Sequence, residues 1–258
     1  MHPSILHIAD GFWNVRGSYK VAGVLDIGTH ASLVRRKGGG FVFLDAYSLS
    51  EPVKRELDEI TRGGREVEAI LNLHPFHTVH VKRMHELFPG ARLYGTARHQ
   101  ARFPDLPWEA TRSEDAATHA LFAEDFEFSV PRGVDFISRD ERVHFSSVLV
   151  RHSATRTLHV DDTLMHLRLP WPLRLLGLDD RTIFHPTLAK ALEKRRGAAD
   201  DFRAWGKDLI DRWGDTENLC TAHTAALISR ENTGASIKDR IAKALEKVEQ
   251  TLQEHAGK

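Results

Sequence analysis

Residues 67–95, VEAILNLHPFHTVHVKRMHELFPGARLYG, decide how this chain should fold. Residues 67–73 form a short apolar run, which predicts a buried strand. Residues 74–77 are then predicted to form a loop, and the segment through His80 and His85 is predicted to form an amphipathic helix. Residues 92–95 are predicted to form a second strand. In open α/β layers, ligands bind where strands end and helices begin. Because His74, His77 and His80 fall at such a junction, this stretch predicts a metal-binding edge.

The composition places the chain among ordinary globular proteins. Its 258 residues are enough to bury a core, with 41% apolar and 28% charged residues. Lys plus Arg and Asp plus Glu number 36 each, and this balance argues against a nucleic-acid or anionic-membrane partner. The sixteen histidines are a high count for this length and are a clue to metal binding.

The expected compartment is the cytoplasm. A single cysteine, Cys220, excludes an intrachain disulfide and fits a reducing environment. The N-terminal residues have no basic region followed by a long apolar run, so no secretory signal is expected. The longest apolar runs are also too short and too interrupted to span a bilayer.

The remaining elements follow from apolar periodicity and turn residues. Strands are expected at residues 5–16 (broken at Asp10-Gly11), 30–36, 40–44, 126–130, 134–137, 144–151, 156–160 and 218–221; helices are expected at 50–60, 96–103, 186–196, 199–213 and 235–255. The order is β-rich, α, β-rich, α. Two such halves predict an α/β (α+β) single domain over residues 1–258, a four-layer αββα sandwich with a C-terminal helix at about 235–255.

Residues 167–178, LRLPWPLRLLGL, are apolar and interrupted by prolines. No regular element is expected there, because proline cannot continue a helix or a central strand. This segment could wall a substrate pocket, and it could equally form the surface of a homo-oligomer.

Histidines and carboxylates recur where the predicted strands end. Four positions come just after a predicted strand: Asp45, the pair His74 and His77, Asp162, and His223. His144 opens a predicted strand. Imidazole and carboxylate groups are the donors that zinc, iron or manganese require. Such sites are assembled from loops that are distant in sequence, so the wide spacing is compatible with one metal site.

These residues stand in motifs that resemble the metallo-β-lactamase fold superfamily. That family has, in order along the chain, an early Asp, an H-x-H-x-D-H cluster, a later His before a hairpin, a G-D-T-L-like turn and a final His. The segments of this chain at the corresponding places are, in the same order, FVFLDAY, LNLHPFH, VHFSSVLV, LHVDDTL and LCTAHTA. The resemblance covers roughly residues 5–225, and FPGARLYG and SATRTLHVDDTL are similar to a divergent branch.

The resemblance implies a metal-dependent hydrolase with the metallo-β-lactamase-like αββα fold. One or two zinc ions, or iron or manganese, would activate a water molecule to attack a small-molecule ester, lactone, thioester or phosphoester. It implies metal ligation by a set of five residues: His74, His77, His144, Asp162 and His223. It also implies catalytic roles for Asp162 and for Asp45, which would orient a ligand histidine and steer the water.

The histidine cluster departs from the family pattern. With His74 at the first position of H-x-H-x-D-H, the other motif positions fall on Phe76, Thr78 and Val79. His77 and His80 are out of register by one residue, which at the start of a helix is a rotation of roughly 100°. The alternative is therefore a degenerate member of the fold without catalysis, acting as a binding or scaffold module. A di-iron redox centre is a third interpretation.

Each candidate also has a purely structural interpretation. Loop histidines can simply bond the backbone, and Asp162 can cap its own turn. His80 and His85 are expected on the exposed face of their helix, and Cys220 is expected to be a buried thiol. The remaining histidines, His185 among them, show no partner pattern.

Overall fold

The computed structural model describes residues 4–18, 20–21, 25–26, 28–168, 180–223 and 225–257. The chain divides into two compact units: residues 1–128 with 151–155, and residues 129–150 with 156–258. The apolar segment at residues 167–178 lies outside the described residues, apart from Leu167 and Arg168.

The first unit is built on a six-stranded sheet in the order β1-β2-β5-β6-β7-β8. Its strands are β1 (Ser4–Ala9), β2 (Phe12–Gly17), β5 (Thr29–Arg35), β6 (Phe41–Leu44), β7 (Val67–Leu71) and β8 (Arg92–Tyr94). The pairs up to β5–β6 are antiparallel, whereas β6, β7 and β8 run parallel. The residues that follow β6 and β7 therefore lie at one edge of this sheet. A short antiparallel pair, β3 (Lys20–Val21) and β4 (Leu25–Asp26), is separate from it.

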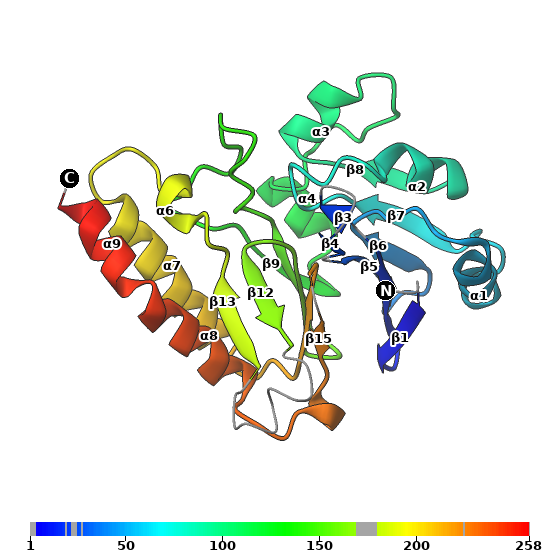
Figure 1. Ribbon diagram of the computed structural model, residues 1–258. Coiled ribbons are helices and arrows are strands. Elements are labelled where there is room, and N and C mark those ends of the chain that lie inside the picture. Colours follow the sequence, from blue (N-terminus) through cyan, green and yellow to red (C-terminus); the bar gives the residue numbers. More distant parts are fainter. Residues whose placement is uncertain are drawn as a thin grey trace. The chain divides into compact units, whose positions relative to one another are not determined.

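Four helices belong to the first unit: α1 (Glu51–Thr61), α2 (Val81–Leu87), α3 (Ala97–Arg102) and α4 (Ala116–Leu121). The helices α1 and α2 connect the parallel strands and lie beside them (Figure 1). They bury Val53, Leu57 and Met84 in the same core as Phe43 and Ile70 of the sheet. These connections position the loops that end the parallel strands.

The second sheet has five strands in the order β15-β14-β11-β10-β9. They are β9 (Phe126–Ser129), β10 (Leu149–His152), β11 (Thr157–Val160), β14 (Asn218–Thr221) and β15 (Ala226–Leu227). The central pair, β11 and β14, is parallel, so the residues after both strands share an edge. An additional antiparallel pair is formed by β12 (Leu164–Leu167) and β13 (Arg181–Phe184).

Helices cover the core of the second unit: α6 (Leu188–Ala191), α7 (Ala198–Arg212), α8 (Ile237–Lys247) and α9 (Glu249–Ala256), with a 3₁₀ turn at Ser229–Glu231. The helices α7, α8 and α9 run side by side (Figure 1, yellow to red). Gly206 permits this packing, because a Cβ there would lie 2.9 Å from Leu245 Cδ1. No helix among the described residues is both long enough and apolar enough to cross a membrane.

Several predicted elements are wrong. Residues 134–137 form no strand, since Val134 makes only an isolated bridge with Leu192. The strand predicted from residue 144 begins at Leu149, because Ser147 N donates to the Thr163 hydroxyl instead of to a neighbouring strand. The helix predicted at 186–196 is reduced to the four residues of α6. The helix predicted at 235–255 is divided at Val248 into α8 and α9.

Candidate metal centre

Asp45 fixes the edge of the first sheet. It follows β6 and adopts a left-handed backbone conformation with φ of 62°, which Asp tolerates better than most residues. Its carboxylate is buried, and Oδ1 accepts a hydrogen bond of 2.8 Å from Leu73 N. Asp45 therefore holds the backbone of the loop that carries His74.

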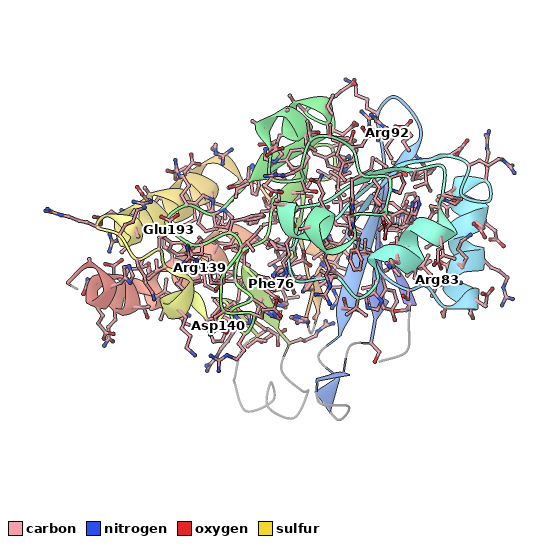
Figure 2. The ribbon with its side chains drawn as sticks, turned by 90° about the horizontal axis from the view of Figure 1, so that it is seen from above. Phe76, Arg83, Arg92, Arg139, Asp140 and Glu193 are labelled. Carbon is pink, nitrogen blue, oxygen red and sulfur yellow. The ribbon has the colours of Figure 1, made fainter. Side chains whose placement is uncertain are left out.

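His74 and His77 lie together in this loop. The turn is closed by His77 N, which donates to His74 O at 3.0 Å. Their rings are stacked, with centroids 4.1 Å apart and planes 22° apart. His74 is completely buried, and its Nδ1 accepts from Phe76 N at 3.1 Å. Figure 2 labels Phe76 in this loop and Arg83 on the helix that follows it. A spacing of three residues in a turn thus brings two imidazoles into contact.

His80 and His85 are half-buried, so the prediction that both are exposed is wrong. His80 is the N-cap residue of α2. Its Nδ1 lies 2.9 Å from Ser48 Oγ, and its ring meets the Tyr47 ring edge-on at 5.0 Å. Burial, together with the nearby His77, lowers the pKa of His80 to about 4. This imidazole is therefore neutral at pH 7.

His99 is a residue of this region that was not predicted from the sequence. It is buried on α3, where Nδ1 accepts from Thr96 N and Nε2 lies 3.3 Å from the carbonyl oxygen of His77. Burial lowers the pKa of His99 to about 4. Thr96 and His99 form a reciprocal capping box at the start of α3, but its sequence signature has Glu or Gln in place of His, so the usual sequence signal for it is absent. His99 thus ties α3 to the turn at His77.

Asp162 and His223 meet at the edge of the second sheet. The parallel register pairs Val160 with Thr221, so the residues two positions beyond each come to equivalent places. His223 Nε2 and Asp162 Oδ1 are 2.8 Å apart, and the two side chains are only 9% and 4% exposed. The sequence assigned both residues to a metal site, and the structure brings them together.

His144 and His185 are further candidate donors in the second unit. His144 lies before β10, and its Nε2 contacts the carbonyl oxygen of Glu141. His185 follows β13, and its Nδ1 lies 2.7 Å from Thr187 Oγ1. Burial lowers the pKa of His185, and the further influences on it are Asp162, which raises it, and His223 and His144, which lower it. His185 was overlooked because β13, which positions it, was not predicted.

The donor atoms at these two edges suit a borderline cation. Each edge is considered within its own unit: His74 and His77 in the first, and His144, Asp162, His185 and His223 in the second. Imidazole nitrogens and a carboxylate oxygen bind Zn²⁺ and similar transition metals. Cys220 is buried within β14, as predicted.

Many solved structures match nearly the whole chain, and three of them are similar to it as follows. A metallo-β-lactamase from Pontibacter korlensis is 13% identical, with a TM-score of 0.57 over 95% of this chain and 99% of that chain. TMB-1 is 14% identical, with a TM-score of 0.61 over 95% and 98%. The metallo-β-lactamase FIM-1 from Pseudomonas aeruginosa, in its mono-zinc form, is 11% identical, with a TM-score of 0.60 over 95% and 96%. No family model and no curated protein matches the sequence.

Proposed function

We propose, from the premise that this chain has the metallo-β-lactamase fold, that it is a metal-dependent hydrolase. The observation that carries the proposal is the buried pair of Asp162 and His223, whose donor atoms lie 2.8 Å apart. A carboxylate and an imidazole that are paired and buried at the ends of parallel strands suit a cation better than they suit a solvated surface.

The ligand roles go to the five residues that the sequence resemblance implies: His74, His77, His144, Asp162 and His223. Their nitrogen and oxygen donors favour zinc, with iron or manganese as alternatives. FIM-1, a protein of the same fold, was solved in a mono-zinc form. One or two zinc ions are proposed here.

When bound, zinc supplies Lewis acidity and acidifies a water molecule, which provides a nucleophile near neutral pH. The chain's own residues prepare this chemistry. Asp45 holds the amide of Leu73 and so places the loop of His74. Asp162 and His223 bring a carboxylate oxygen and an imidazole nitrogen together at a buried position. The proposed substrate is a small molecule with an ester, lactone, thioester or phosphoester bond.

Elemental analysis tests the proposal. The purified chain, and the chain reloaded with zinc after chelation, should each contain a transition metal. Initial rates with p-nitrophenyl acetate, an acyl lactone, an acyl thioester and bis(p-nitrophenyl) phosphate should then identify the bond that is cleaved. Asp162→Ala should lose metal and activity, whereas Asp140→Ala, at an exposed Asp paired with Arg142 (Asp140 is labelled in Figure 2), should keep both. A chain that contains no transition metal and takes none up is not a metallohydrolase.

The altered histidine motif favours a second candidate, a binding module without catalysis. Phe76, Thr78 and Val79 occupy motif positions at which the family has ligands, and Val79 is 70% exposed. On this interpretation His144→Ala and His223→Ala should leave stability and partner binding unchanged. Metal content that depends on these two residues would exclude it.

A further inference from the structure

His80 carries a buried nitrogen whose role the proposed ligand set does not explain. Its Nε2 is shielded from solvent and has no hydrogen-bond partner among the described residues. Leaving a polar atom buried in this way costs the free energy of its lost hydration. Such an atom in a folded protein calls for an explanation, which can be a bound water or ion.

The other ring nitrogen is already engaged. His80 Nδ1 lies 2.9 Å from Ser48 Oγ, and donation from Nδ1 to this hydroxyl leaves the lone pair on Nε2. Metal-binding histidines typically donate their second ring N–H to such a partner, which fixes the tautomer and the ring orientation. The edge-on contact with Tyr47 restricts the same ring further. Tyr47 is itself held, because its hydroxyl accepts from Ser18 N at 3.2 Å.

His80 also continues the histidine series of its loop. His74, His77 and His80 are spaced H-x-x-H-x-x-H, and the turn stacks the first two rings. All three residues and Ser48 belong to the first unit. The first unit therefore carries a third imidazole in the same short segment as the two that the proposed function already uses.

We propose that His80 is an additional metal ligand, binding through Nε2 with Ser48 as its hydrogen-bond partner. The spacing H-x-x-H-x-x-H would then replace H-x-H-x-D-H as the histidine motif of this chain. The inference rests on the proposed function, since it requires that the chain binds a transition metal.

Cobalt(II) titration of the full chain tests the inference without any substrate. His80→Ala should weaken cobalt binding by more than tenfold and change the visible d–d absorption of the complex. Ser48→Ala keeps the imidazole but removes its partner, and should weaken binding by about tenfold. His85→Ala is the matched control, because His85 is half-buried on the same helix but about 140° around its axis. This control should bind cobalt as the unmodified chain does.

The outcomes separate this inference from the proposed function. If the unmodified chain binds no cobalt or zinc, the proposed function fails and the role of His80 fails with it. If the unmodified chain binds cobalt and both His80→Ala and Ser48→Ala keep its affinity and spectrum, only the role of His80 is refuted. Circular dichroism of the metal-free variants verifies that they are folded, and the milder Ser48→Ala keeps the test decisive if His80→Ala is not.

Discussion

Replacing Asp162 by Asn should separate its structural contribution from metal binding. Asn has nearly the size of Asp and keeps an oxygen at the place where Asp162 Oδ1 lies 2.8 Å from His223 Nε2. It removes the negative charge that a cation requires. Asp162→Asn should therefore fold like the unmodified chain in the absence of metal and lose the stabilisation that metal provides.

The geometry sets the expected magnitudes. A polar interaction with a charged group contributes about 1.5–3 kcal/mol and a neutral one about 1 kcal/mol, so Asp162→Asn should cost about 0.5–2 kcal/mol without metal. For a chain of this size that is a decrease in Tm of roughly 1–8 °C. Asp162→Ala removes the carboxylate beside the buried His223 imidazole, and breaking such a buried pair costs about 3–5 kcal/mol.

Thermal unfolding in a chelator and in added zinc measures both effects. Zinc at a hundred times its Kd should stabilise the unmodified chain by about 2.7 kcal/mol, which corresponds to an increase in Tm of roughly 5–11 °C. Asp162→Asn should show no such increase. An equal zinc-dependent increase in Asp162→Asn and in the unmodified chain would refute the assignment of Asp162 as a ligand.

Three further predictions concern stability, each measured by denaturant unfolding in a chelator. Arg36→Met should cost about 3–5 kcal/mol of folding stability, because Arg36 Nε donates at 2.9 Å to an Asp125 carboxylate that is 1% exposed. Lys37→Met, at the exposed pair with Glu124, should change stability by less than about 1 kcal/mol. Equal effects of the two substitutions would contradict the importance of burial. Gly133→Ala should cost more than about 2 kcal/mol of folding stability, because the φ of Gly133 is +75° and a Cβ there would lie 2.0 Å from Ala198 O. Gly38→Ala should be nearly neutral, because a Cβ at Gly38 would meet no atom within 4 Å. Stability should also fall as the pH drops from about 6.5 towards 4. Burial lowers the folded-state pKa to about 4 for four histidines, so the unfolded chain takes up protons there that the folded chain does not: His80, His99, His152 and His166. A stability that does not change over this pH range would contradict the prediction.

The fold class could be predicted because its signals are local. The likeness to solved metallo-β-lactamases confirms the predicted fold. Asn218–Thr221 is a strand with the bounds that its apolar run indicated, and α7 begins and ends within one residue of the predicted helix at 199–213. The elements that were missed lack such signals. Residues 111–125 have no clear period, yet they contain α4.

The candidate site was harder to predict, because its contacts depend on pairing between distant segments. The closeness of Asp162 and His223 follows from the parallel register of β11 and β14, which are separated by 57 residues of chain. His185 is positioned by β13, whose partner β12 was not predicted. The half-burial of His80 depends on Ser48 and Tyr47, which lie more than thirty residues earlier. Spacing along the sequence contains no information about any of these contacts.

The two edges respond differently to a changed motif, because different parts of the structure position their side chains. At the second edge, Asp162 and His223 each follow a parallel strand by two residues, so the sheet register itself sets their separation. At the first edge, the histidines lie in a turn and at a helix start, where one added residue rotates a side chain by roughly 100°. A shift in the histidine spacing therefore rearranges the donors of the first unit and leaves the Asp162–His223 pair in place. On this reasoning, loss of the H-x-H-x-D-H register changes how a metal is held and does not by itself abolish the site.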